Sequence, residues 1–582
     1  MKALYAILFL AVISSGVYAQ TTSDKPAEKQ EQLIFATDRL LAETNGLRLA
    51  ANRAYVLARV GKFLCKTDRN RATEQFRLSV GELTTAQSTA IDLKKGNLSN
   101  DLSNSTSIRP AILRSIAECD AELALQSLYR TRPPMIELAM GGTREKTNKI
   151  GDNTINLTAI GQNEVALEQS IIRLAADQNP DRASALLKES LKKGLTTETF
   201  ALLQRLNTKE PEEASRIANS VLETLVNTAF TKTNPPNYQG LALASSFLSD
   251  YIRAKGQDEK FLKYDDAAMR SLEERAVALY LEQGKGAGYI SSDLLIRAAE
   301  KLSPANVIRL KAQEKANIAK YGGSTVQRNE ELTKLMSSNP TAERLVAEAK
   351  NYSQDQRRQI LYSAAYKMAD RDDYGAAAAL VNENFSDDVQ ENASQSLNWY
   401  YAHRLMNLGK YPEAERMMND FPENNRNAAL INLAQVVFDK DKEKNAAYAV
   451  SILNRIRASL PERPPTQQEM GYLLQLVNAY TKIDPAQAFD MVEALVPQIN
   501  ELCDASIVIT SFQGGSNMEQ GEGIIVQGMP FAFYLDYSVV QKLADKDLDR
   551  TEKFIEQFSR LEMRVNLKMQ LAENLATKQP SN

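Results

Sequence analysis

The chain is 582 residues long, with 43% hydrophobic and 25% charged residues. That composition is typical of a large folded protein and excludes a disordered one. Lysine and arginine total 70 against 73 aspartates and glutamates, which leaves a formal net charge of −3. A protein whose main partner is nucleic acid has a strongly basic surface, so we expect no nucleic-acid partner.

Residues 1–19 have the pattern of a secretory signal peptide. Lys2 precedes an apolar run from Ala3 to Ile13, and Val17-Tyr18-Ala19 fits a cleavage site before Gln20. The run is well short of the roughly 20 apolar residues of a membrane-spanning helix, and no comparable run follows. We therefore expect an exported protein, periplasmic or extracellular, with no transmembrane segment after cleavage.

The remainder of the chain divides into five predicted regions. In chain order they are a flexible leader (20–32), irregular helical repeats (33–230), a helical middle region (238–360), more regular helical repeats (361–500), and a glycine-rich insertion with C-terminal helices (501–582). Proline, glycine and polar residues predict a loop over 132–156 and a break at 234–237. These interruptions are too short to indicate a clear linker between domains.

One local pattern recurs eight times: a capping-type residue, then alanine four positions later, then an apolar stripe. The pairs are Asp68/Ala72, Asp120/Ala124, Asn179/Ala183, Glu210/Ala214, Asp373/Ala377, Lys410/Ala414, Asn445/Ala449 and Asp484/Ala488. An Asp or Asn oxygen accepts a hydrogen bond from the unpaired N–H groups that open a helix, and Lys410 is the one poor cap. The alanine and the apolar residues predict one buried face, which needs neighbouring helices to cover it.

The spacing of these alanines is regular in the C-terminal half, at 414 − 377 = 37, 449 − 414 = 35 and 488 − 449 = 39 residues. Gly409, Tyr411, Ala414 and Met418 follow the Gly-x-Tyr-x-x-Ala-x-x-x-apolar order of a tetratricopeptide second helix. The chain resembles a tetratricopeptide-like array over about 361–421, and more loosely to Leu495. We predict an all-α fold, an α-α superhelix of degenerate tetratricopeptide-like repeats with a small β-hairpin or loop insertion near the C-terminus.

A second resemblance concerns the chain overall. It is to uncharacterised secreted helical proteins of acidobacterial type, and the residues that carry it are Arg53-Ala54, Leu64-Cys65-Lys66-Thr67-Asp68, Arg71-Ala72 and Phe76, followed by Pro180-Asp181-Arg182-Ala183, Leu186-Leu187 and Ser190-Leu191. The resemblance implies export and a helical array, and it implies no activity.

The segment from Ile507 to Phe533 departs from the helical pattern. A β-branched run, Ile507 to Thr510, is followed by Gly514-Gly515 and further glycines, which predicts a β-hairpin or long loop inserted between helices. A phosphate-cradling loop is the alternative, but no Gly-Lys-Ser/Thr follows.

Three cysteines, Cys65, Cys119 and Cys503, allow at most one internal disulfide. Cys65 and Cys119 both precede a repeated helix, so adjacent repeats could bring them together as a disulfide. The alternative is three buried free thiols.

The chain has one histidine, His403, and this excludes His-rich zinc sites and two-histidine iron sites. No Gly-x-Ser-x-Gly supplies a nucleophile for a serine triad. We expect no catalytic residue, no metal site and no cofactor. Adjacent acids such as Asp265-Asp266 and Asp372-Asp373 point in different directions from a helix, unlike a glycosidase pair.

Trp399 and His403 are four residues apart and share one face of a predicted helix, while Tyr401 and Leu405 share a neighbouring face. If the second face is buried, Trp399 and His403 line a groove; the alternative is that Trp399 is a core anchor. We expect an exported helical-repeat scaffold that binds a protein or peptide partner in the cell envelope without catalysis. The alternative function is a hydrolase of envelope polysaccharide that uses a carboxylate pair. The oligomeric state stays open.

Overall fold

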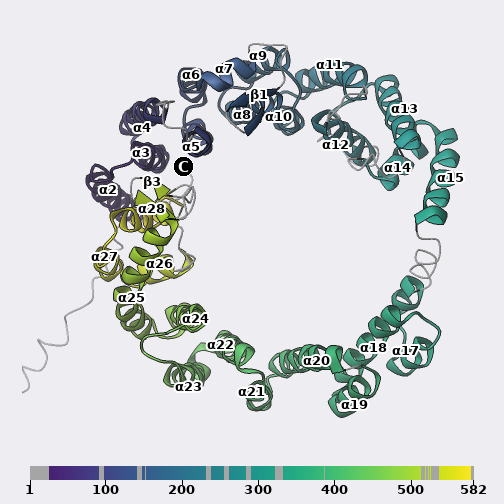
Figure 1. Ribbon diagram of the computed structural model, residues 1–582, viewed down its shortest axis with the longest axis vertical. Helices are drawn as coiled ribbons and strands as arrows, with labels where there is room; N and C mark the ends of the chain where they lie inside the picture. The colour runs from purple at the N-terminus through teal and green to yellow at the C-terminus, as the bar shows by residue number, and fades with distance from the viewer. Residues whose placement is uncertain are drawn as a thin grey trace, which may run out of the picture. The chain divides into compact units, whose positions relative to one another are not determined.

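The computed structural model describes residues 25–90, 98–140, 147–150, 153–230, 238–254, 261–283, 290–321, 332–385, 387–512, 518–519, 522–523, 525 and 537–577. Within these residues the chain is built from α-helices, with two short antiparallel β-hairpins (Figure 1). The predicted all-α repeat fold is therefore confirmed. The chain forms two compact units: residues 1–88, 499–532 and 540–582 make unit 1, and residues 89–498 and 533–539 make unit 2.

Unit 1 combines the first and the last of the described helices. Its elements are α2 (Lys25–Thr44), α3 (Ala50–Leu64), most of α4 (Arg69–Ala90), the end of α25 (Pro485–Phe512), β3 (Met518–Glu519), β4 (Glu522–Gly523), most of α26 (Tyr537–Ala544), α27 (Leu548–Glu556) and α28 (Leu561–Thr577). Helix α2 packs against α28 and α3, and α28 also packs against α3 and α27. The first and the last described helices thus share one core, in which Leu40, Val56 and Val565 are fully buried.

Unit 2 contains two stretches of consecutive helices. The first has α5 (Leu98–Ala117), α6 (Ala121–Arg130), α7 (Pro134–Met140), β1 (Thr147–Ile150), β2 (Asn153–Asn156), α8 (Leu157–Gln178), α9 (Pro180–Leu191), α10 (Thr197–Asn207), α11 (Pro211–Thr228), α12 (Tyr238–Ala254), α13 (Asp266–Gln283), α14 (Ser292–Leu302) and α15 (Pro304–Tyr321). The second has α17 (Ala342–Ala349), α18 (Gln354–Ala369), α19 (Tyr374–Asn384), α20 (Asp387–Asn407), α21 (Tyr411–Asn419), α22 (Glu423–Lys440), α23 (Lys442–Ser459), α24 (Gln467–Ile483) and the start of α25.

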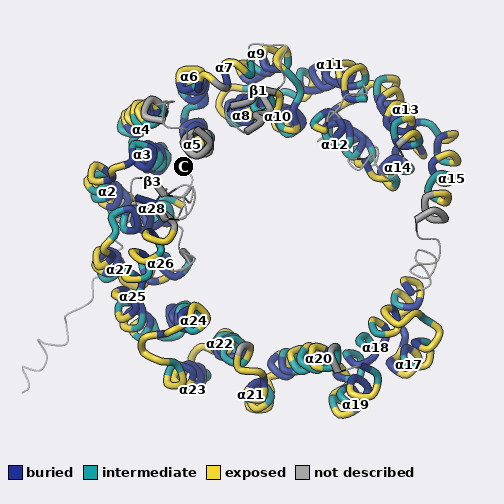
Figure 2. The backbone as a smooth tube through the Cα atoms, in the orientation of Figure 1, coloured by how far each residue is buried: buried dark blue, intermediate teal, exposed yellow. Residues whose placement is uncertain are grey.

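Helices in both stretches pack in pairs, and alternate helices contact one another. Thus α8, α10, α12 and α14 form one row of successive contacts, and α18, α20, α22 and α24 form another. Most of these helices are buried on one side and exposed on the other (Figure 2), as expected for stacked amphipathic helices. Helix α8 differs, because it has no exposed residue from Glu164 to Ala176.

The eight recurring alanines were predicted to be buried, and all eight are fully buried. Five of the eight preceding residues cap their helices through a side-chain oxygen: Asp68, Asp120, Asn179, Asp373 and Asp484. Glu210 and Lys410 occupy the N-cap position without a side-chain bond.

Asn445 was wrongly predicted as a cap. Helix α23 begins earlier, because the Asp441 side chain accepts a hydrogen bond from the backbone N–H of Lys444 at 3.1 Å. The Asn445 amide lies inside the helix and donates to the carbonyl of Val437 at 3.0 Å.

The 37-residue spacing is also visible in the backbone. Asp372 and Gly409 both adopt a left-handed conformation, with φ of 61° and 75°, one residue before the N-cap positions of α19 and α21. Glycine adopts this conformation freely, and aspartate is among the few other residues that tolerate it. The turn between paired helices is therefore the same at two positions where the residues differ.

The C-terminal insertion differs in part from the prediction. Residues 507–510, expected as a strand, belong to α25, because Ile499, Cys503 and Ile507 are buried at intervals of four residues. A short hairpin does follow, in which β3 pairs antiparallel with β4. The glycines at 514–515 and residues 526–533 lie outside the described residues.

Two N-terminal segments also differ from the prediction. Helix α2 begins at Lys25, within the expected leader. The expected loop over 132–156 contains α7 and a second hairpin, in which Thr147 pairs with Asn156 and Ile150 with Asn153. Those strands are mostly polar and lack the alternation that identifies a strand in sequence.

Candidate functional site

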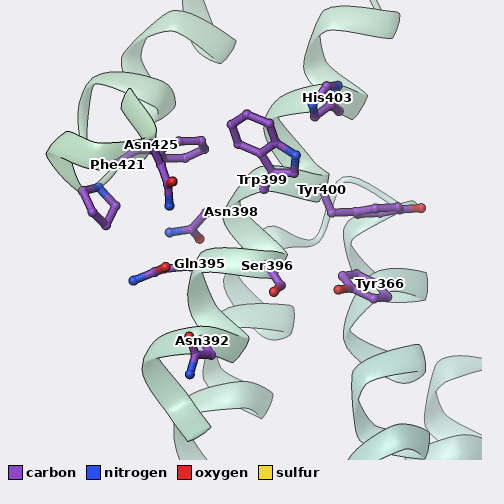
Figure 3. Close-up of a pocket in the computed structure, with 11 residues that line it drawn as sticks. Tyr366, Asn392, Gln395, Ser396, Asn398, Trp399, Tyr400, His403, Phe421 and Asn425 are labelled. Carbon is purple, nitrogen blue, oxygen red and sulfur yellow. The ribbon is translucent and has the colours of Figure 1, made fainter. Parts of the chain in front are cut away.

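A pocket of about 550 Å³ lies beside α20 in unit 2 (Figure 3). We call it the α20 pocket, and its lining residues are Tyr366, Asn392, Gln395, Ser396, Asn398, Trp399, Tyr400, His403, Phe421, Pro422 and Asn425. Three consecutive members of the helix row contribute to it. Tyr366 comes from α18, seven residues come from α20, and Phe421, Pro422 and Asn425 come from the start of α22 and the turn before it.

The spacing of residues on α20 explains how one helix lines most of the pocket. Asn392, Ser396, Trp399 and His403 lie at i, i+4, i+7 and i+11, which is one continuous face. The neighbouring face is turned inward: Leu405 is buried, and Tyr401 packs on the core and stacks on Tyr374, with ring centroids 4.9 Å apart.

Trp399 lies at the centre of the pocket wall. Its indole ring contacts the His403 ring edge-on, with centroids 5.1 Å apart, and the Phe421 ring at 5.6 Å. Trp399 is 37% exposed, whereas Phe421 is buried. The indole is therefore held by two rings while part of its surface faces the pocket, and it is not a core anchor.

A second aromatic pair lies on the other side of the pocket, away from Asn425 and Phe421 (Figure 3). The rings of Tyr366 and Tyr400 have centroids 4.6 Å apart, and the Tyr400 hydroxyl donates to Asp370 Oδ1 at 2.7 Å. Burial and this hydrogen bond raise the pKa of Tyr400 above its ordinary value. Tyr400 therefore stays protonated near neutral pH, and its ring is held in place.

The polar lining consists of amides and one hydroxyl. Asn398 Oδ1 accepts a hydrogen bond from the Tyr374 hydroxyl, which leaves the Asn398 NH₂ group as a donor. Gln395 Nε2 donates to Glu391 at 3.2 Å, which leaves the Gln395 carbonyl as an acceptor. Ser396 and Asn425 add groups that both donate and accept. The pocket therefore offers donors and acceptors beside aromatic surface.

No lining residue carries a charge near neutral pH. Burial lowers the pKa of His403, so its imidazole is neutral there. The charged groups next to Tyr400 pair with one another: Arg404 lies 3.5 Å from Asp370 and donates to Asp372 at 3.2 Å. One residue in four of the chain is charged, so an uncharged lining of this size is a distinctive feature.

Sequence reasoning singled out Trp399 and His403, and the structure brings them together in the pocket wall. It missed Tyr366, Phe421 and Asn425, because these come from other parts of the chain. It also missed Asn392, Gln395 and Ser396, although their spacing from Trp399 on one helix face could have indicated them.

The adjacent acids have structural roles. Asp265 caps α13 through the backbone N–H of Ala268, and Asp266 accepts a hydrogen bond from the Tyr251 hydroxyl. Asp373 caps α19, and Asp372 pairs with Arg404. Among the described residues that line the α20 pocket, none is a carboxylate. Within the described part of the chain, no three His, Cys, Asp or Glu side chains are grouped to hold a metal ion.

The cysteines lie at helix ends or within a core. Cys65 ends α3, and Cys119 immediately precedes the cap of α6. Cys503 is a buried free thiol, and burial raises its pKa to about 11. A Cys65–Cys119 disulfide stays a prediction.

The helices and their row packing define the class of this chain as an all-α helical-repeat protein. No family model matches the chain, and no curated protein matches it. Among solved structures it is similar to one described as a "Circular tandem repeat protein with novel repeat topology and enhanced subunit contact surfaces". The identity is 12%, with 88% of this chain and 98% of that chain covered, and a TM-score of 0.19. At that score nothing further about this chain follows from the likeness.

None of the described helices combines the length and the apolar character needed to cross a membrane.

Proposed function

We propose that this protein is an exported helical-repeat scaffold that binds a peptide segment of a partner protein through the α20 pocket, without catalysis. The observation that carries the proposal is the lining of that pocket, in which partly exposed aromatic rings lie beside amide donors and acceptors. Rigid aromatic side chains are frequent anchors of protein interfaces. Stacked helix pairs supply the extended surface that a peptide needs.

We further propose that α18 to α24 form a tetratricopeptide-like array. Two observations support this proposal: the shared left-handed turn residue at Asp372 and Gly409, and the buried alanines at 377 and 414. In such an array the first helices of successive pairs, here α18, α20 and α22, line one surface. These are the helices that line the α20 pocket.

Panning a random peptide library displayed on phage against the purified protein tests the proposed function. We expect enriched peptides whose binding, measured by calorimetry, falls at least tenfold in Trp399→Ala. Ile308→Ala is the matched control, because Ile308 is 75% exposed on α15 and lies outside the pocket. Failure to enrich any peptide, or equal binding by Trp399→Ala and wild type, would overturn the proposal.

Export is supported by the Lys2, Ala3–Ile13 and Val17-Tyr18-Ala19 pattern, which lies outside the described residues. The mass of the protein isolated from the cell envelope or the medium tests it. We expect a mature chain that begins at Gln20. A chain that retains residues 1–19 and remains in the cytoplasm contradicts export and leaves the peptide-binding proposal standing.

A further inference from the structure

The α20 pocket also carries information about which peptides it accepts. Its eleven lining residues include four amide side chains, one hydroxyl-bearing serine and five aromatic rings, counting His403, but no Lys, Arg, Asp or Glu. Burying a charged group without a counter-charge is costly, since it loses hydration that nothing replaces. The pocket is therefore matched to an uncharged ligand.

The chemistry of the amides narrows the ligand class. A peptide bond presents one N–H donor and one C=O acceptor. The free Asn398 NH₂ group and the free Gln395 carbonyl supply the complementary pair, and both project from the same helix. Asn425 faces them from across the pocket (Figure 3). A main chain lying along α20 can thus exchange hydrogen bonds with both walls.

The length of the lined face gives the size of the segment. Asn392 and His403 are eleven residues apart on α20, which at 1.5 Å per residue is about 16 Å. An extended chain advances about 3.3 Å per residue, so the face accommodates a segment of about five residues. Trp399 lies within this face, and its partly exposed indole offers a surface for one aromatic ring, at the offset or edge-on geometries that such rings prefer.

We propose that the α20 pocket binds an extended, uncharged peptide segment of about five residues with an aromatic side chain packed on Trp399. This proposal rests on the proposed function and adds its selectivity. A charged residue within the bound segment would contact neutral amides and aromatic rings, which offer it no counter-charge. Segments with Asp, Glu, Lys or Arg at the central positions are therefore rejected.

The test compares peptides that differ only in charge. One peptide enriched by display is synthesised with its ends blocked, and residues beside its aromatic residue are replaced by Asn, Asp or Lys. We expect the Asn peptide to bind as well as the parent, and the Asp and Lys peptides each at least tenfold more weakly. Equal binding of all three peptides would overturn the inference while leaving the proposed function intact.

A charge placed in the pocket gives the reciprocal test. Ser396 is exposed at the centre of the lined face, so Ser396→Lys adds a positive charge without disturbing a core. We expect this variant to prefer the Asp peptide over the Lys peptide by at least tenfold. Ser220→Lys is the control, because Ser220 is exposed on α11 outside the pocket, and it should keep the wild-type preference. No change in preference in Ser396→Lys would place the peptide elsewhere and overturn the inference.

Aromatic rings beside amides also suit neutral sugars. Binding experiments with two sugars therefore distinguish a saccharide ligand from a peptide ligand. Calorimetry with maltotriose and with a trimer of N-acetylglucosamine should show no binding at ligand concentrations at which the peptide saturates the protein. Trp399-dependent binding of either sugar, with no peptide enriched by display, would overturn both the selectivity and the peptide function.

Discussion

At the scale of single residues, two helices of this protein allow the contribution of an N-cap hydrogen bond to the free energy of unfolding to be measured. Helices α9 and α11 offer a matched pair, because both have proline at their first position and a buried alanine three residues later. They differ in the cap: Asn179 accepts a hydrogen bond from the Arg182 N–H at 3.1 Å, whereas Glu210 makes no cap bond.

We expect Asn179→Ala to lower the free energy of unfolding by about 1 kcal/mol. Glu210→Ala should change it by less than about 0.5 kcal/mol, because no cap bond is lost. Urea unfolding followed by far-UV circular dichroism measures both. Equal losses in the two variants would show that the caps do not explain where these helices begin.

His403 is the second residue-scale test. Because it is the only histidine of the chain, its imidazole gives a single set of NMR signals that report on the pocket. We expect a pKa below the ordinary value of about 6.5, since burial disfavours the charged form. A folded-state pKa below the unfolded one means that the His403 contribution to stability is present at neutral pH. It is lost as the pH falls through the folded pKa. A titration at or above the ordinary value would contradict the half-buried, neutral imidazole.

At the scale of elements, the sequence predicted helices well where a cap and a buried stripe coincide, as at Asp120, Asn179 and Asp373. It failed where packing outweighs local preference. The β-branched run from Ile507 to Thr510 favours a strand by composition, yet it continues α25 because Ile507 extends a buried helical face.

The pocket was only partly predictable for a related reason. Helical spacing relates Trp399 to His403 within α20, but it does not relate them to Tyr366 or Phe421, which lie 33 and 22 positions from Trp399 in the sequence. Which residues meet across helices depends on the packing of α18, α20 and α22. A single sequence contains no direct signal for that packing.

The segment that leads into helix α3 is held by a residue far away in the sequence. Its own N-cap residue, Leu49, offers no cap bond. The buried carboxylate of Glu522 instead accepts hydrogen bonds from the N–H groups of Arg48 at 2.7 Å and Leu49 at 3.3 Å, and from Asn52 Nδ2 at 2.7 Å. Asn52 in turn bonds the backbone of Gly523 and Ile525.

We expect Glu522→Ala to lower the local opening free energy of the α3 N-terminus by about 3 kcal/mol, because it leaves buried donors without an acceptor. Hydrogen exchange of residues 48–56 should then be about a hundredfold faster, with exchange in α20 unchanged. Glu74→Ala, at an exposed position on α4, is the control and should leave exchange at 48–56 unchanged. Wild-type exchange in Glu522→Ala would show that the carboxylate does not hold the start of α3.

At the scale of the whole molecule, the first and last helices cover one another within unit 1. Arg39 pairs with Glu552, Arg59 with Glu573, and the buried Lys568 with Glu43. Terminal repeats of a helical array need a face that shields the apolar surface of the end helix. Here the first and the last described helices provide that shield for each other.

The thiol count of the whole chain tests the predicted disulfide. If Cys65 and Cys119 pair, unreduced protein contains one reactive thiol after denaturation and three after reduction. In the native protein that thiol, Cys503, should react slowly at neutral pH, because it is buried with a pKa of about 11. Three reactive thiols in unreduced, denatured protein would contradict the disulfide.

The central claim is that a peptide binds in the α20 pocket, and Trp399 tests it directly because it is the only tryptophan in the chain. Selective excitation of tryptophan during titration with a display-selected peptide reports on that pocket wall alone. We expect a saturable change in Trp399 emission with the dissociation constant that calorimetry gives, accompanied by a shift of the His403 NMR signals. Saturable binding by calorimetry with no change at Trp399 or His403 would place the peptide elsewhere and contradict the account.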